Sequence, residues 1–172
     1  FLNKMDATLG GTLSAFEVMW NDFYRLLIGD GSTHGKPLDT SHAFYVLLES
    51  TGGHEQSDKI QFESALEEAF ESGLIVDAAV AQSKQQREDL WAIRDSVAEY
   101  GKVLGPIIGF DIGLPTPTMH ASTQAMLAAI HEQWPNAVVL FFGHVGDCNL
   151  HVVVHVPGMG EAQPHHAVES LV

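Results

Sequence analysis

Residues 141–154 have the sequence Phe-Phe-Gly-His-Val-Gly-Asp-Cys-Asn-Leu-His-Val-Val-Val, in which two β-forming segments flank a short polar turn. The pattern predicts a β-hairpin with a two-residue loop at Asp147 and Cys148. This register sets His144 opposite His151, with Cβ atoms about 4.5–5.5 Å apart. Two imidazoles at that spacing can share one metal ion, or they can form a hydrogen-bonded pair across the hairpin. The hairpin is therefore a candidate metal site.

Nine residues of this stretch, Gly143 to His151, carry a family resemblance. They resemble the Gly-His-x-Gly-Asp-Gly-Asn-Leu-His motif of FAD-linked 2-hydroxy-acid dehydrogenases of the vanillyl-alcohol-oxidase type. This family includes D-lactate dehydrogenases, the glycolate oxidase flavin subunit and D-2-hydroxyglutarate dehydrogenases. The one departure is Cys148, where the family usually has glycine. The resemblance implies the C-terminal, substrate-side domain of such an enzyme.

The resemblance also implies roles for residues of the hairpin. His144 and His151 resemble the family's metal ligands, which implies a divalent ion, Zn²⁺ or Mn²⁺. Asn149 resembles a residue that lies beside substrate and flavin, although an asparagine here can also serve only to form the turn. Cys148 stands where a two-residue loop needs positive φ, so either the loop is wider or its backbone is strained.

A second candidate site residue is Arg94, in a predicted long helix. It projects about 70° from the centre of the apolar face of that helix, so its guanidinium is expected at the margin of the core. A half-buried arginine needs an anion, either a neighbouring carboxylate or a substrate carboxylate held by the planar guanidinium. The string Leu90-Trp91-x-x-Arg94 resembles the family's substrate-carboxylate arginine motif, which implies the second partner.

Two other segments resemble the family and bear on the substrate. Residues 110–115, Phe-Asp-Ile-Gly-Leu-Pro, are similar to its Asp-x-x-hydrophobic-Pro strand end. Residues 13–17 are similar to its domain entry, where Glu17 is interpreted as a core-edge glutamate. The 2-hydroxyglutarate branch has a lysine and an asparagine at the positions of Gly109 and Val153. These departures count against a dicarboxylate, so a small 2-hydroxy acid such as D-lactate or glycolate is expected.

The order of predicted elements indicates an α+β fold. Residue patterns predict strands over residues 12–19, 40–50, 74–81, 106–114 and within 138–156. They also predict a short amphipathic segment over 20–28, a loop from Gly29 to Thr40, and helices from Ser57 to Gly73, from Ser83 or Lys84 to Leu104, and from Thr116 to Pro135. This order predicts a mostly antiparallel sheet with helices on one face, in a duplicated ferredoxin-like arrangement.

Composition restricts the class of protein and its partners. The chain is predicted to form one domain over residues 1–172, and its 8 Lys+Arg against 22 Asp+Glu give a formal charge of −14. This charge repels nucleic acid and anionic membranes. No apolar run approaches the ~20 residues of a membrane span. One cysteine rules out an internal disulfide framework and suits a reducing compartment, so a cytoplasmic location is expected.

We therefore interpret the chain as a fragment that supplies the substrate and metal side of an FAD-dependent 2-hydroxy-acid dehydrogenase. Nothing in it resembles a pyrophosphate-binding loop, so FAD is expected to be bound mainly by an FAD-binding domain of the same parent protein. The chain alone is expected to be inactive and to self-associate through an uncovered apolar face. The general base is unassigned, and the family's third metal ligand, a glutamate in a Ser-x-Glu-His-Gly motif, is not found before Val172.

Two other classes of function are also open at this point. One is a non-catalytic ferredoxin-like module that binds a regulatory ligand or a metal through Arg94 and the two histidines. The other is an association domain in which the histidines are structural.

Overall fold

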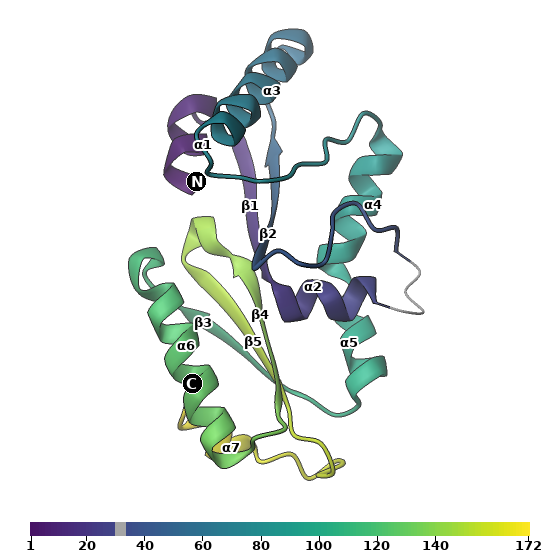
Figure 1. The fold of residues 1–172 in the computed structure, drawn as a ribbon, viewed down its shortest axis with the longest axis vertical. Helices are drawn as coiled ribbons and strands as arrows, with labels where there is room; N and C mark the ends of the chain where they lie inside the picture. The colour runs from purple at the N-terminus through teal and green to yellow at the C-terminus, as the bar shows by residue number, and fades with distance from the viewer. Residues whose placement is uncertain (30–33) are drawn as a thin grey trace.

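The computed structural model describes residues 1–29 and 34–172, and an antiparallel sheet of five strands forms its central layer (Figure 1). Residues 30–33 of the predicted loop lie outside the described residues. The strands are β1 (Leu13–Trp20), β2 (Phe44–Ser50), β3 (Ile108–Gly113), β4 (Val138–His144) and β5 (Asn149–His155). Their order across the sheet is β2-β1-β4-β5-β3, and every neighbouring pair is antiparallel. The predicted α+β class and antiparallel sheet are confirmed.

The helices found in the described residues are α1 (Leu2–Leu9), α2 (Asn21–Ile28), α3 (Glu55–Glu71), α4 (Lys84–Asp95), α5 (Val97–Leu104), α6 (Thr116–Gln133) and α7 (His165–Glu169). Figure 1 shows α2, α4 and α5 on one side of the sheet and α6 on the other, with α1 against α3 near the end of β2. None of these helices is both long and apolar enough to cross a membrane, as far as the described residues show.

Helices therefore cover both faces of the sheet, which corrects the prediction of one covered face. Side chains alternate between the two faces along a strand. Phe141 of β4 belongs to the same buried cluster as Met126 of α6. Its neighbour Phe142 stacks on Phe23 of α2, with ring centroids 4.3 Å apart. Because both faces are buried, β4 is a continuous apolar run rather than an alternating one.

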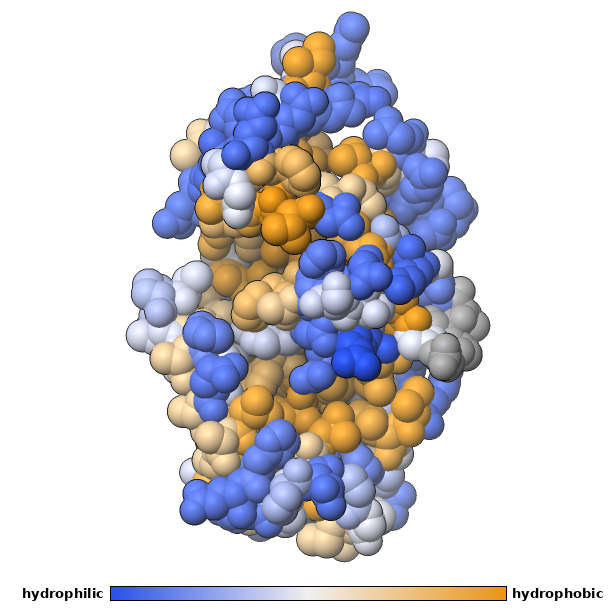
Figure 2. Space-filling view, viewed as in Figure 1, coloured by the Kyte–Doolittle hydropathy of each residue, from blue (hydrophilic) through white to orange (hydrophobic). Residues whose placement is uncertain are grey.

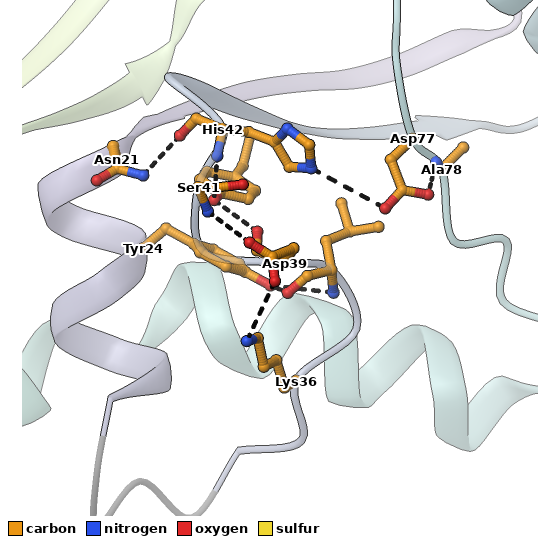
Figure 3. A network of polar contacts seen from close by, with 10 residues as sticks. Asn21, Tyr24, Lys36, Asp39, Ser41, His42, Asp77 and Ala78 are labelled. Atoms are coloured by element: carbon orange, nitrogen blue, oxygen red, sulfur yellow. Dashed lines mark hydrogen bonds and ion pairs between the residues drawn. The ribbon is translucent and has the colours of Figure 1, made fainter.

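The segment from Leu74 to Ala81 is predicted as a strand but forms none. It is an extended connection between α3 and α4, and its apolar residues Leu74 and Val76 are exposed. Asp77 of this segment lies 4.0 Å from His42, two residues before β2 (Figure 3). The predicted duplication of a ferredoxin-like unit is thus incomplete in the described part of the chain, because this strand is missing from it.

The predicted long helix is also two helices, α4 and α5, which are separated at Ser96. α4 begins at Lys84, within the predicted start, and Ser83 caps it by accepting a hydrogen bond from the Gln86 N–H. The Ser96 hydroxyl donates to the Ala92 carbonyl at 2.5 Å, and a ψ of 40° ends the helix. Serine competes with helical backbone bonds in this way. Arg94 consequently lies in the last turn of α4.

Polar contacts hold residues 38–42, just before β2 (Figure 3). The Tyr45 hydroxyl donates to the Asp39 carbonyl at 2.7 Å. The Asn21 amide donates to the Thr40 carbonyl at 2.8 Å. These bonds use backbone groups of the turn, so β2 begins at Phe44 rather than at the predicted Thr40.

β4 and β5 form the predicted hairpin, but in a register two residues away from the predicted one. His151 pairs with Phe142 instead of His144. The loop is a 3₁₀ turn, Val145–Asp147, followed by Cys148 with φ 60° and ψ 20°. The loop is therefore wider than predicted, and Cys148 also has the positive φ. A shift of two residues keeps both histidines on one face, because side chains alternate with a period of two.

Candidate functional site

Arg94 is placed over the sheet by its helix. Trp91, one turn earlier in α4, donates from its indole nitrogen to the Glu49 carboxylate of β2 at 2.8 Å. Ile93 is buried among the apolar residues beneath the helix. The Arg94 side chain then points toward β1 and β4, and the residue is 8% exposed. It is therefore buried, and not at the core margin as predicted.

The guanidinium of Arg94 has three polar neighbours. Its Nε donates to Oε2 of Glu17 at 2.7 Å, and Glu17 is only 3% exposed. Its Nη1 donates to Asp95 at 3.3 Å, and its Nη2 lies 3.0 Å from Nε2 of His144. The predicted alternative of a neighbouring carboxylate is thus present in this structure. The outer edge of the guanidinium is held less firmly, because the Asp95 side chain is 61% exposed.

His144 completes a closed triangle with Arg94 and Glu17. It pairs with Glu17 across β1 and β4, and its Nδ1 contacts Oε1 of the same carboxylate. A guanidinium can only donate, so Nε2 of His144 must accept from Arg94. The ring proton is therefore on Nδ1, where it is donated to Glu17.

His151 lies beside this triangle. Its ring centroid is 5.3 Å from that of His144, and the two ring planes make an angle of 76°. Its Nδ1 is 3.5 Å from Asp111 of β3. Burial lowers the pKa of His151, and Arg94 and His144 lower it further against the opposing effect of Asp111. The neutral imidazole, which is the form that ligates metals, is thus favoured.

Asn149 and Asp111 form the outer side of the site. The Asn149 amide donates to Asp111 at 2.6 Å. Its carbonyl oxygen is buried and has no hydrogen-bond partner among the described residues. An unsatisfied buried acceptor costs about 1–3 kcal/mol, so this oxygen is suited to accept an N–H or O–H from a ligand. The role of Asn149 beside substrate and flavin stays a prediction.

The separation of the two histidine rings is compatible with a shared ion, with centroids 5.3 Å apart. Rings at this separation can turn their nitrogens onto one ion with bond lengths of about 2.0–2.1 Å. No group of three His, Cys, Asp or Glu side chains in the described part of the chain is arranged to hold a metal. Nε2 of His144 must also lose its contact with Arg94 before it can ligate an ion.

A cavity of about 1390 Å³ lies elsewhere, along the outer edge of β2. Its walls come from α3, from the segment between α3 and α4, and from α4. Figure 2 shows apolar side chains gathered on this face below α3, within hydrophilic surroundings. Arg94, His144 and His151 do not line this cavity. The candidate site is therefore identified by its charged and hydrogen-bonding side chains, and not by the size of a cavity.

Sequence reasoning missed the parts that Glu17 and Asp111 play in this site. Glu17 was interpreted as a core-edge glutamate, whereas it is buried and binds both Arg94 and His144. Asp111 was interpreted only as part of a strand end, yet it pairs with His151 across β3 and β5. Pairing of β1 with β4 and of β3 with β5 would have revealed both roles. That pairing could be predicted only from the order of the strands in the sheet.

Comparison with known proteins assigns the chain to a family. The family model for FAD linked oxidases, C-terminal domain, matches residues 3–171, so the chain belongs to this family. The resemblance seen in the sequence is confirmed.

Curated relatives agree with this assignment. A mitochondrial D-2-hydroxyglutarate dehydrogenase of Arabidopsis thaliana is 31% identical over 84% of this chain and 25% of its own length. A D-2-hydroxyglutarate dehydrogenase of Stutzerimonas stutzeri is 29% identical over 91% of this chain and 32% of its own length. A Schizosaccharomyces pombe protein with the provisional name mitochondrial D-lactate dehydrogenase is 31% identical over 84% of this chain and 29% of its own length. The chain thus spans about a quarter to a third of these relatives.

Proposed function

We propose that the chain is the substrate side of an FAD-dependent dehydrogenase that oxidises a small 2-hydroxy acid. One observation carries the proposal: Nη2 of Arg94 lies 3.0 Å from Nε2 of His144. A 2-hydroxy acid has its carboxylate and its hydroxyl on adjacent carbons. The Arg94 guanidinium and the His144 imidazole are therefore close enough to bind the carboxylate and the hydroxyl of one such molecule.

Each residue has a defined part in this proposal. Arg94 holds the substrate carboxylate, and Asn149 contacts substrate and flavin. His144 and His151 hold a divalent metal, Zn²⁺ or Mn²⁺, close to the 2-hydroxyl. When bound, the metal would favour ionisation of that hydroxyl and FAD would supply the acceptor for the hydride of C2. The general base is not assigned to a residue of this chain.

The strand beside His151 supports a small substrate. Gly109 and Val153 pair directly with each other across β3 and β5, two residues from Asp111 and His151 on the same face. Neither side chain can bind a second carboxylate. Among the described residues, the ion pairs and hydrogen bonds of the site include one arginine and no lysine. We therefore propose D-lactate or glycolate rather than D-2-hydroxyglutarate, the compound in the names of two relatives above.

Turnover by a full-length protein that includes the FAD-binding domain tests this function. We expect a kcat/KM for D-lactate or glycolate at least tenfold above that for D-2-hydroxyglutarate, with an artificial electron acceptor. The reverse preference would contradict the substrate class. A flavin-loaded protein that binds 2-hydroxy acids without oxidising any would favour the alternative function, a non-catalytic ligand- or metal-binding module.

We also propose an FAD-binding domain of the same parent protein as the partner of this chain. Large exposed apolar residues support an additional interface, and they include Phe44, Ile60 and Phe70. Without that domain, such a surface favours self-association, which sedimentation of the chain at several concentrations would detect. The proposed cytoplasmic location rests on the single cysteine, and two of the relatives above are named as mitochondrial.

A further inference from the structure

We propose that Glu17 is the positioning residue of this site. Its carboxylate fixes His144 as the Nδ1–H tautomer and holds Arg94 through Nε. The Nε2 lone pair of His144 and the Nη edge of Arg94 are thereby directed at the ligand. The tautomer follows from the contacts alone, whereas its use in binding metal and substrate rests on the function proposed above.

Burial makes Glu17 an unusual glutamate. A carboxylate that is 3% exposed has lost its hydration and must be compensated by a charge and by hydrogen bonds. Both of its oxygens are used, but by different partners: Oε2 accepts from Arg94 and Oε1 accepts from His144. Glu17 therefore sets the positions of the two side chains relative to each other.

The contact with His144 decides which nitrogen faces the site. Histidines that ligate metals commonly donate their other ring N–H to a carboxylate, which orients the ring and raises its basicity. Glu17 occupies that position for His144. Nε2 is consequently the nitrogen that a ligand can use once Arg94 gives up its contact with that atom.

The contact with Arg94 decides which edge of the guanidinium is available. Because Nε is bound to Glu17, a bidentate carboxylate has to use Nη1 and Nη2. These atoms now contact the exposed Asp95 and His144. A carboxylate that takes both Nη atoms also removes Arg94 from Nε2 of His144, so carboxylate binding prepares that nitrogen for a metal.

The tautomer can be measured in the purified chain without metal, flavin or substrate. Two-bond ¹H–¹⁵N correlation spectra distinguish the two imidazole tautomers, and His144→Gln identifies the resonances. We expect the Nδ1–H form in the wild type. In Glu17→Gln, a donor NH2 replaces one acceptor oxygen beside Nδ1, which favours the Nε2–H form against the opposing contact of Nε2 with Arg94, so we expect the Nε2–H form to gain population. Glu49→Gln is the matched control, because Glu49 also accepts from α4 but touches neither histidine, and it should keep the Nδ1–H form.

A wild-type spectrum with His144 mainly as Nε2–H overturns the inference, as does an unchanged tautomer in Glu17→Gln. If Glu17→Gln does not fold, exchange of the wild-type Nδ1 proton decides the question. We expect slow exchange with water, because the proton is donated to a buried carboxylate, and rapid exchange would contradict that bond.

Zn²⁺ affinity provides the second readout. Loss of a carboxylate that orients a ligating histidine typically weakens metal binding about 10–100-fold, which we expect for Glu17→Gln and not for Glu49→Gln. Equal Zn²⁺ affinity in the wild type and Glu17→Gln overturns the positioning role. Absence of Zn²⁺ binding by the wild type, together with the Nδ1–H tautomer, would instead contradict the proposed metal site and leave the geometric role of Glu17 supported.

Discussion

The imidazole rings of His144 and His151 meet with centroids 5.3 Å apart, although the two residues do not pair across the hairpin. Phe142 pairs with His151, and the Phe142 ring lies 4.8 Å from that of His151. His144 lies two residues after Phe142 in β4, so its side chain is on the same face. A diagonal pair of this kind leaves the Nε2 atom of His144 within reach of Arg94.

This arrangement predicts weak, histidine-dependent binding of Zn²⁺ or Mn²⁺. Two imidazoles supply half of a tetrahedral shell. We expect His144→Gln and His151→Gln each to weaken binding in equilibrium dialysis at least tenfold, about 1.4 kcal/mol. His155→Gln, on the same strand but bonded to the Pro106 carbonyl, is the control and should bind normally. Binding that survives both site variants would eliminate the metal site.

Arg94→Lys should impair turnover of 2-hydroxy acids by a full-length protein. Lysine keeps the charge but loses the planar guanidinium. A charged hydrogen bond is worth about 1.5–3 kcal/mol, so kcat/KM should fall about 10–100-fold. Arg87→Lys changes an exposed arginine of the same helix and should have no effect. Normal kinetics in Arg94→Lys would refute the carboxylate-binding role. Because Arg94 is buried rather than at the core margin, this variant should also lose some stability.

Glu17→Ala should destabilise the fold strongly. It removes one partner of a buried ion pair and leaves Arg94 without its carboxylate. Such changes typically cost about 3–5 kcal/mol in the free energy of unfolding. Glu68→Ala breaks an exposed pair with Lys4 and should cost less than about 1 kcal/mol. Urea unfolding measures both, and equal losses would mean that burial of Glu17 has no energetic consequence.

Stability should fall in acid partly because of His151. Its folded-state pKa is lowered, mainly by burial, so the unfolded chain binds its proton more readily than the folded chain does. The stabilisation is complete above the unfolded pKa of about 6.5 and is lost as the pH falls through the lower folded pKa. His151→Gln should flatten the dependence of unfolding free energy on pH in this range. A variant with the same pH dependence as the wild type would show that His151 does not contribute.

Cys148→Gly should stabilise the turn slightly. Among the described residues other than glycine, only Cys148 has positive φ, and an L side chain there costs about 1–2 kcal/mol. Glycine removes this cost but has greater freedom in the unfolded chain, which offsets about 0.5–1 kcal/mol. We expect a net gain of about 0.5 kcal/mol by thermal or urea unfolding. Cys148→Ser keeps the Cβ atom and should show no gain; equal stability of all three proteins would argue against strain in this turn.

The sequence alone determined the features that depend on near neighbours in the chain. Alternation and turn residues predicted the β4–β5 hairpin, and a proline in the first turn predicted the start of α6 at Thr116. The side on which both histidines lie was also predicted correctly, although the register was wrong by two residues. Side-chain direction repeats every two residues along a strand, so this error did not change the face.

Elements that need a distant partner could not be predicted in this way. The short helix α1 is stabilised where Met5 and Leu9 are buried beside Ala65 of α3. Conversely, the apolar run of residues 74–81 has the composition of a strand but gains no strand neighbour in the described structure. Short segments are marginal by themselves, and tertiary packing decides their conformation.

Tertiary structure also decided the chemistry of the site. Glu17 is 77 residues from Arg94 and 127 residues from His144 in the chain, and only the order of β1 beside β4 and the crossing of α4 bring the three together. Charge and residue type are properties of the sequence. Burial is a property of the fold, because it depends on which distant segments exclude water from the same point. It is burial that makes the carboxylate of Glu17 bind an arginine and a histidine so firmly.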